Sequence, residues 1–304
     1  MAAPRRLQGK VESPFLLENT EAYQRWRDRK LAGQPAGLGN LVVEIKDPLV
    51  LRESERQAIL ERCRKTNMAL YISPAPGSRE VPLAIGHQLG LQDLDHNWLA
   101  DDDGLTSLTV AENGERTNFI PFSDRPIKWH TDGYYNSPDE QIHALLLHCE
   151  QRAAHGGENA LMDHEIAYIL LREADPEHIR VFMSDDVMTI PARMEGDYTV
   201  REDRTGPVFT VNPLTGNLHM RYTVRTHHVL WRDDPATHAA VQCLTKFLEG
   251  DSPAIYHGLL EPGMGLISNN VLHDRAGFQD GPSHRRLLYR ARYYDRIEGT
   301  DWHE

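Results

Sequence analysis

The sequence predicts an α+β protein whose core is an antiparallel, double-sheet barrel with inserted and flanking helices. From residue 105 onward, short apolar runs are separated by Gly, Pro and Asp, which is typical of short strands. The first hundred residues alternate helical and strand patterns instead. A chain of 304 residues also fits one large barrel domain, and it is long enough to bury about 75% of its unfolded surface.

The front portion, residues 21–100, is expected to pack on this barrel as a set of helices and strands, so that residues 1–304 form a single domain. Residues 1–20 are expected to be irregular. Helical and strand periodicities then alternate along the front portion, and they predict a charged helix, a strand, a second helix, a second strand and a short helix before Gly90: Glu21–Leu31, Leu41–Ile45, Arg52–Lys65, Met68–Ile72 and Pro82–Leu89.

The barrel portion contains the remaining strands and two helices. We expect helices from near His164 and over Pro235–Leu248, which ends before Gly250. A turn at His155–Gly157 precedes a short segment, Ala160–Met162, that leads into the first of these helices. Alternating or continuous apolar runs predict the strands: Leu105–Ala111, Ile142–Cys149, Val187–Pro191, Val208–Val211, Asn217–Tyr222, Gly265–Ser268 and Arg286–Tyr293.

Two loops are long enough to cover the mouth of a barrel. They span residues 118–128 and 194–206, and we interpret both as candidate lids. The second loop is rich in charged residues, so a disordered segment without function is the alternative interpretation there.

The charge balance disfavours nucleic acid and membrane partners. Lys and Arg total 33 against 45 Asp and Glu, which gives a formal net charge of −12. The three cysteines form no CxxC pair, which indicates reduced thiols in a cytoplasmic protein. No apolar stretch has the length of a transmembrane helix, and no secretory h-region follows the N-terminal arginines.

A candidate metal site is the most informative feature of the sequence. His130 and Asp132 are two positions apart, so in an extended segment their side chains point to the same side. His273 lies 143 positions later (273 − 130) and is the candidate third ligand. Two imidazoles and one carboxylate leave open positions on Fe(II), as a non-haem oxygenase requires. The alternative is an Asp-Gly turn whose histidine bonds to the backbone.

Four segments, in order, give the chain a family resemblance. They are Trp129-His130-Thr131-Asp132, the turn at residues 156–159 followed by residues 160–163, the Glu261-Pro262-Gly263 lead into Leu272-His273, and residues 285–290, in which Arg286 lies thirteen positions after His273 (286 − 273). The chain resembles the taurine/2,4-dichlorophenoxyacetate dioxygenase family of Fe(II)- and 2-oxoglutarate-dependent oxygenases, from about residue 41 to residue 292. This combination is far more specific than an isolated His-x-Asp pair.

The resemblance implies a double-stranded β-helix, or jelly roll, as the core. It also implies Fe(II) as cofactor, with 2-oxoglutarate and O2 as co-substrates that are converted to succinate and CO2 while a substrate C–H bond is oxidised. Asp132 is retained here, whereas halogenating relatives lack the carboxylate, so hydroxylation or a related oxidation is expected.

The resemblance further assigns roles around the iron. Arg286 matches the arginine that binds the C5 carboxylate of 2-oxoglutarate, and Asn159 stands where close relatives have a threonine bonded to the same group. Arg290 lies four positions after Arg286 and is a candidate for substrate binding. Arg292 is expected near the rim of the barrel, without a firm role. Tyr134 and Tyr135 are candidates for a substrate wall, with core packing as the alternative.

The function expected from these residues is oxidation, most simply hydroxylation, of a small acidic or amino-acid-like molecule. Desaturation, epoxidation or cyclisation in natural-product biosynthesis uses the same cofactors, and the outcome depends on how the substrate is placed. A non-catalytic sensor that binds iron and 2-oxoglutarate is a further alternative. The prime substrate is a small molecule, and a homo-oligomer is left open.

Overall fold

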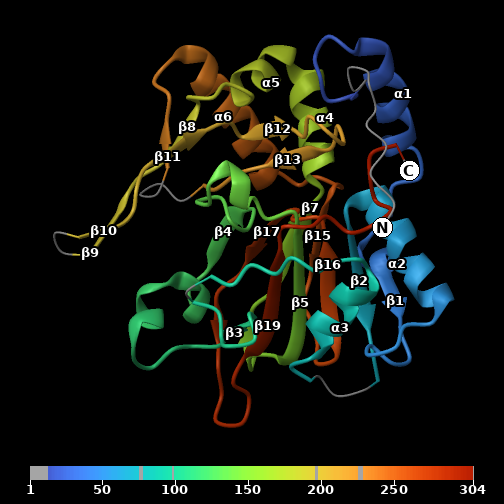
Figure 1. Ribbon diagram of the computed structural model, residues 1–304, viewed down its shortest axis with the longest axis vertical. Coiled ribbons are helices and arrows are strands. Elements are labelled where there is room, and N and C mark those ends of the chain that lie inside the picture. The colour runs from blue at the N-terminus through green and yellow to red at the C-terminus, as the bar shows by residue number, and fades with distance from the viewer. Residues whose placement is uncertain (1–12, 75–77, 98, 196–197, 225–228, 304) are drawn as a thin grey trace.

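Two facing sheets form the centre of the computed structural model, which describes residues 13–74, 78–97, 99–195, 198–224 and 229–303 (Figure 1). The larger sheet has six strands, and only its β1–β2 pair is parallel. In spatial order they are β1 (Val42–Glu44), β2 (Met68–Ile72), β16 (Met264–Ser268), β5 (Ala144–Gln151), β19 (Leu287–Tyr293) and β3 (Thr106–Leu108).

The smaller sheet is fully antiparallel and carries the candidate metal ligands. Its spatial order is β15 (Ile255–Gly258), β7 (Asn159–Met162), β17 (Leu272–Arg275) and β4 (Ile127–His130). Leucines of both sheets, such as Leu147 and Leu161, pack together between them. No ladder between the described residues joins the two sheets into a closed barrel.

Strand β5 shows why the central strands are apolar on both faces. Leu145 and Leu147 face the core between the sheets, whereas Ala144 and Leu146 belong to a second core on the outer side of the larger sheet. Helices α2 (Glu53–Thr66) and α3 (Val81–Gln88) cover that outer side. A strand buried on both faces reads as a continuous apolar run rather than an alternating one.

Helices also cover the outer side of the smaller sheet, at the top of Figure 1. Asp163 accepts the Glu165 N–H and Asp234 accepts the Ala236 and Thr237 N–H groups, so aspartates cap the starts of α4 and α6. The helices here are α1 (Thr20–Leu31), α4 (His164–Ala174), α5 (Pro176–Phe182) and α6 (Pro235–Glu249). No helix in the described ranges is long and apolar enough to cross a membrane.

The remaining elements are short. The 3-10 helices are η1 (Leu38–Leu41), η2 (Glu115–Asn118), η3 (Ile120–Phe122) and η4 (Pro138–Glu140). The additional strands are β6 (His155–Gly156), β8 (Met188–Ile190), β9 (Arg193–Glu195), β10 (Tyr198–Arg201), β11 (Arg204–Gly206), β12 (Phe209–Val211), β13 (Leu218–Met220), β14 (Leu230–Trp231) and β18 (Phe278–Gln279).

The structure corrects the sequence predictions in several places. The front portion does not only pack on the sheets, because β1 and β2 extend the larger sheet beside β16. The expected strand at residues 105–111 is shorter, since only Thr106–Leu108 pairs with β19. Residues 155–157 were expected to be a turn, but His155–Gly156 pairs with β18. Strands β4, β15 and β17 and helix α5 were not predicted.

The second lid candidate is ordered as strands in its described part. Strands β9 and β10 pair as an antiparallel arm that projects from the molecule, and β11 pairs with β8 (Figure 1). The Arg193 guanidinium at the start of the arm lies 4.2 Å from the centre of the Phe119 ring. The first lid candidate therefore contacts the base of this arm, next to the second lid candidate, and the function of both segments as lids stays a prediction.

Candidate metal and co-substrate site

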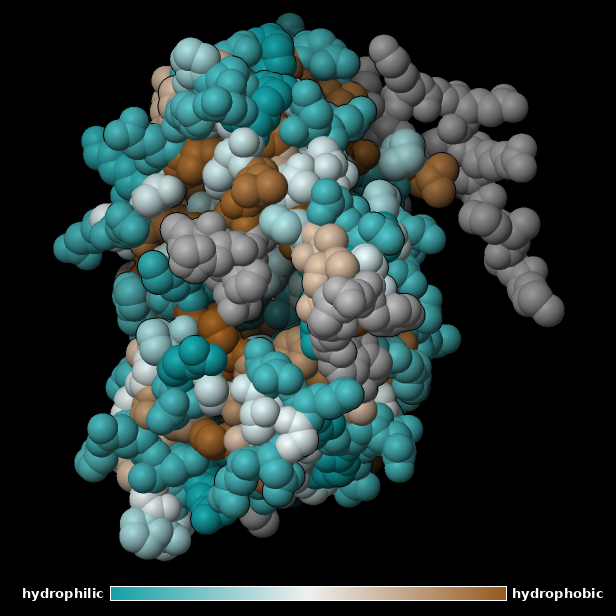
Figure 2. Space-filling model, turned by 90° about the vertical axis from the view of Figure 1, so that its left-hand side faces the viewer, coloured by the Kyte–Doolittle hydropathy of each residue, from teal (hydrophilic) through white to brown (hydrophobic). Residues whose placement is uncertain are grey.

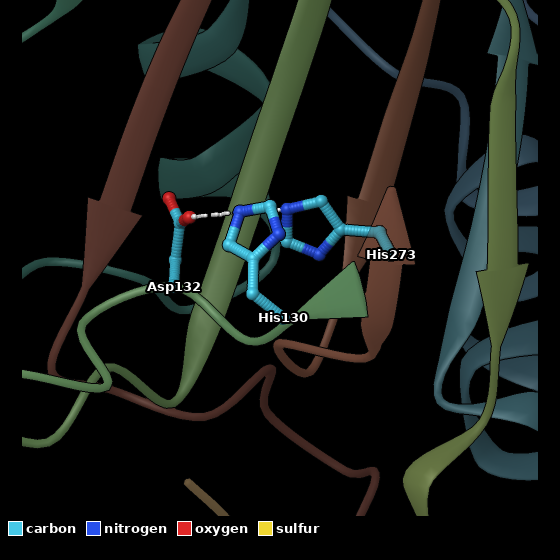
Figure 3. Close-up of side chains that lie close together, drawn as sticks. All are labelled: His130, Asp132 and His273. Carbon is cyan, nitrogen blue, oxygen red and sulfur yellow. Dashed lines mark ion pairs between the residues drawn. The ribbon is translucent and has the colours of Figure 1, made fainter. Parts of the chain in front are cut away.

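The three expected metal ligands lie together at the edge of the smaller sheet (Figure 3). His130 ends β4 and is the direct register partner of His273 on β17, while Asp132 follows β4 by two residues. Their candidate ligand atoms all lie within 4.8 Å of one another. Oδ1 of Asp132 is 3.5 Å from Nε2 of His130 and 3.8 Å from Nε2 of His273.

Both imidazoles are oriented by the backbone carbonyl two residues earlier in the chain. Nδ1 of His130 lies 2.9 Å from the Lys128 oxygen, and Nδ1 of His273 lies 2.9 Å from the Val271 oxygen. A carbonyl can only accept, so each Nδ1 carries a proton, and Nε2 is the ring nitrogen left to face the metal position. This arrangement of a carbonyl behind a histidine ligand is the usual one in metal sites.

The charge states at this site also suit a metal ion. Burial alone raises the pKa of Asp132, but Arg290, His130 and Arg292 together hold it well below its ordinary value. Burial, assisted by the neighbouring His130, lowers the pKa of His273 to about 4. At neutral pH, therefore, Asp132 is ionised and His273 is neutral, which are the forms that bind a metal.

These donors fit ferrous iron. Two imidazole nitrogens and one carboxylate oxygen converge from one side, and no other described His, Cys, Asp or Glu joins this group as a fourth ligand. Open positions therefore remain for a chelating co-substrate and O2. A closed structural zinc site would instead have four protein ligands.

Arg286, the expected anchor of 2-oxoglutarate, is buried with an unmet hydrogen-bonding group. Its side chain lies 5.1 Å over the Phe278 ring, and Nη1 has no partner among the described residues. Burial lowers its pKa to about 10, so the guanidinium is still charged at neutral pH. Because a buried, unpaired charge is costly, this site favours an incoming carboxylate.

Arg290 contacts the metal ligand set directly. Its Nη1 atom lies 3.1 Å from Oδ2 of Asp132, the oxygen that does not face the two imidazoles. Both side chains are nearly buried, with exposed fractions of 12% and 5%. Arg290 therefore orients the carboxylate ligand from the side away from the two imidazoles.

Arg292 was expected near the rim, and this was wrong, because only 3% of it is exposed. It pairs with Asp95 and donates to the Tyr135 hydroxyl at 2.9 Å. Tyr135 packs against Tyr134 with ring centres 5.2 Å apart, and Tyr134 meets His130 edge-on at 6.5 Å. Both tyrosines are partly buried and pack against the helix-covered core, so their role as a substrate wall stays a prediction.

Asn159 has a partner other than Arg286. Its Nδ2 atom donates to the Asp274 carbonyl at 2.6 Å. It also lines a small gap between the sheets, whose walls are mostly leucine side chains. Any contact of Asn159 with the co-substrate would use the atoms that this hydrogen bond leaves free.

Asp95 and Asn270 were not predicted from the sequence as site residues. Asp95 lies in the irregular stretch before β3, and only the structure shows that it pairs with Arg292. Asn270 bonds to the backbone of Asp132, and its position three residues before His273 was the one available signal.

On the face shown in Figure 2 the surface is hollowed at mid-height, and β4 lies toward this same side in Figure 1.

Comparison with known proteins agrees with this geometry. A model of the family described as taurine catabolism dioxygenase TauD, TfdA family matches residues 28–292. A uridine-5'-phosphate dioxygenase of Amycolatopsis sp is 29% identical over 170 residues, which are 54% of this chain and 60% of that enzyme. One of Streptomyces sp is 28% identical over 226 residues, 72% of this chain and 80% of that enzyme.

Solved structures share the fold at low sequence identity. The non-heme iron oxygenase OrfP in complex with Fe and alpha-ketoglutaric acid has a TM-score of 0.57 and 16% identity, covering 80% of each chain. An asparagine oxygenase in complex with Fe(II), hydroxyasparagine and succinate has a TM-score of 0.57 and 13% identity, covering 94% of this chain and 86% of that one.

Proposed function

Because the chain belongs to the taurine catabolism dioxygenase TauD, TfdA family, we propose that it hydroxylates a C–H bond of a small anionic molecule, using Fe(II), 2-oxoglutarate and O2 and releasing succinate and CO2. The observation that carries this proposal is the convergence of His130, Asp132 and His273 within 4.8 Å. We also interpret the two facing sheets as the halves of a double-stranded β-helix.

We assign metal binding, co-substrate binding and orientation of the carboxylate ligand to different residues of the site. Nε2 of His130, Nε2 of His273 and Oδ1 of Asp132 would hold the iron, which together with 2-oxoglutarate supplies the oxidising chemistry when bound. Arg286 would bind the far carboxylate of 2-oxoglutarate through its planar guanidinium. Arg290 holds Oδ2 of Asp132, which directs Oδ1 toward the metal position.

The buried charges favour an anionic substrate. Arg286, Arg290 and Arg292 are all buried or nearly so, and the buried carboxylates that face them are Asp95 and Asp132. When iron is bound, Asp132 shares its negative charge between the iron and Arg290, and Arg286 is neutralised by 2-oxoglutarate. Of the three guanidinium groups, Arg290 is then the one least neutralised by nearby carboxylates. A carboxylate or phosphate group of the substrate would neutralise the Arg290 guanidinium.

A nucleoside 5'-phosphate is the first substrate class to test, since two relatives act on uridine 5'-phosphate. An amino acid is the second. The assay is succinate release by iron-loaded protein with uridine 5'-phosphate, uridine, or single amino acids. We expect turnover that requires both O2 and an anionic substrate. If no anionic compound raised succinate release and the protein bound no 2-oxoglutarate, the proposal would be wrong.

Two alternatives remain distinguishable by product analysis. Hydroxylation adds one oxygen to the substrate mass, whereas desaturation or oxidative cyclisation removes two hydrogens. Epoxidation of an alkene also adds one oxygen, so the position of the new C–O bond must be determined. A sensor would bind iron and 2-oxoglutarate without converting any substrate.

A further inference from the structure

A single asparagine side chain holds the backbone of the metal ligand Asp132 from both sides. Oδ1 of Asn270 accepts the Asp132 N–H at 2.8 Å, and Nδ2 donates to the Asp132 carbonyl at 2.9 Å and to the Ile142 carbonyl at 2.7 Å. Asn270 is 3% exposed. We propose that Asn270 is a positioning residue that sets the carboxylate ligand before iron binds; this rests on the metal site of the proposed function.

The chemistry of this contact requires an amide. One end of the side chain must accept an N–H while the other donates to two carbonyls, and a primary amide does both. Aspartate in its place would direct an oxygen at the carbonyls of Asp132 and Ile142. Loss of the donors would leave both of these buried oxygens without this partner, and each such loss costs about 1–3 kcal/mol.

The backbone of Asn270 is itself held in an uncommon conformation. Its φ is 51°, and Asn67 is the only other described residue besides glycine with a positive φ. Such a conformation costs free energy and persists where surrounding contacts over-determine it. Asparagine tolerates this region better than most residues. Asparagine therefore suits position 270 both because it adopts the positive φ and because its amide makes the hydrogen bonds to Asp132 and Ile142.

The turn at Asp132, which Asn270 holds by hydrogen bonds, is constrained in a second way. Gly133 follows Asp132 with a φ of 70°, and a Cβ placed there would lie 2.5 Å from Cγ1 of Ile142. On the other side of Asp132, Thr131 exchanges hydrogen bonds with the backbone of Tyr222, at 3.0 and 3.1 Å. Asp132 is therefore fixed from both neighbouring segments.

Asn270 also links the two halves of the ligand set. It lies three residues before His273 in sequence and bonds to Asp132, which is 138 residues away. A shift of the segment that carries His273 would therefore move Asp132 with it. This coupling keeps the carboxylate and the second imidazole of the ligand set at a fixed spacing.

Asn269 provides a matched control within the same segment. It is also 3% exposed, and its side chain is also fully engaged. Its Nδ2 atom donates to Oδ1 of Asn67 and to Oγ1 of Thr300, both at 3.0 Å, and its Oδ1 accepts the Ile297 N–H at 3.3 Å. These contacts belong to the fold and do not touch the Asp132 turn.

The experiment compares metal affinity and thermal stability in four variants. Asn270→Asp and Asn270→Gly remove the amide, and the glycine variant keeps the positive φ. Asn269→Asp and Asn67→Gly are the matched controls, the latter at the other position with positive φ. Metal-free protein is titrated anaerobically with Fe(II), and with Mn(II) as a redox-inert probe, and melting temperatures are recorded separately.

We expect all four variants to melt earlier, but only the Asn270 variants to bind metal about 10- to 100-fold more weakly, as loss of a partner behind a ligand does in other metal sites. Asn270 variants within about twofold of the wild-type affinity would overturn the proposal. So would an equal loss in the Asn269 variant. Wild-type protein that bound Fe(II) but released no succinate would contradict the proposed function and leave the role of Asn270 standing.

Discussion

The metal end and the co-substrate end of the site are built differently. At the metal end every ligand side chain already has a partner: a carbonyl behind each imidazole, and Arg290 at the outer oxygen of Asp132. At the co-substrate end, Arg286 is buried, and its Nη1 atom has no partner among the residues that the structure describes. The first end is pre-organised for a cation, whereas the second holds a charge whose partner must arrive with the ligand.

This difference predicts opposite effects of mutation on the metal-free fold. Removing a metal ligand breaks contacts that the fold already makes. Removing Arg286 relieves an uncompensated burial cost while it destroys a binding contact.

Asp132→Ala should have the largest effect. We expect no turnover above background, because one of three iron ligands is lost. The metal-free protein should also lose about 3 kcal/mol of stability, because Arg290 is left buried without its carboxylate. Succinate release measures turnover, denaturant unfolding measures stability, and Fe(II) titration measures the loss of metal affinity. Full metal affinity in this variant would remove Asp132 from the ligand set.

Arg286→Leu should come next. Loss of a bidentate, charge-assisted contact of about 3 kcal/mol corresponds to roughly 100-fold weaker 2-oxoglutarate binding. The stability of the metal-free protein should stay the same or rise, in contrast to Asp132→Ala.

Arg285→Leu is the control for this variant. Its side chain is 73% exposed and, within the described part of the chain, forms an ion pair only with the exposed Glu112, so 2-oxoglutarate binding should not change. An unchanged 2-oxoglutarate requirement in Arg286→Leu would assign the anchor to another arginine.

Acid should also act on buried histidines outside both ends of the site. Burial lowers the pKa of His148 to about 4, and burial, with a smaller contribution from Arg296, does the same for His143. Unfolded histidine titrates near pH 6.5. The unfolded chain therefore takes up protons first, so stability is complete above about pH 6.5 and is lost as the pH falls toward 4.

We expect the metal-free protein to melt roughly 5 °C lower at pH 5 than at pH 7.5. His148→Gln should show a smaller difference between the two pH values, because one of the titrating groups is gone. An identical pH dependence in this variant would show that His148 does not contribute.

Asn159→Ala should have the smallest effect. Its amide already donates to the Asp274 carbonyl, so any contact with 2-oxoglutarate is a secondary one. We expect a 2-oxoglutarate affinity about two- to fivefold weaker, well below the loss in Arg286→Leu. If Asn159→Ala lost as much 2-oxoglutarate affinity as Arg286→Leu, Asn159 would contribute to 2-oxoglutarate binding as strongly as Arg286.

The parts of the site that the sequence predicted are those set by local spacing and side-chain chemistry. His130 and Asp132 are two positions apart, and His273 has a recognisable context, so the three ligands were found together. The long, periodic helices were found for the same reason. Strands β4, β15 and β17 were missed because they are short and carry polar residues that only the paired sheet explains.

The parts that were missed depend on contacts between distant segments. The partner of Arg292 is Asp95, on an irregular segment nearly two hundred residues earlier, so no local pattern places this arginine in the interior. Asn270 depends on a left-handed backbone and on the turn at Asp132. Neither is encoded by periodicity along the chain.

The most direct test is a crystal structure of the protein loaded anaerobically with Fe(II) and 2-oxoglutarate. The account predicts one iron ion bound by Nε2 of His130, Nε2 of His273 and Oδ1 of Asp132, with the far carboxylate of 2-oxoglutarate on Arg286. An ion bound elsewhere, or any of these three side chains turned away from it, would contradict the account.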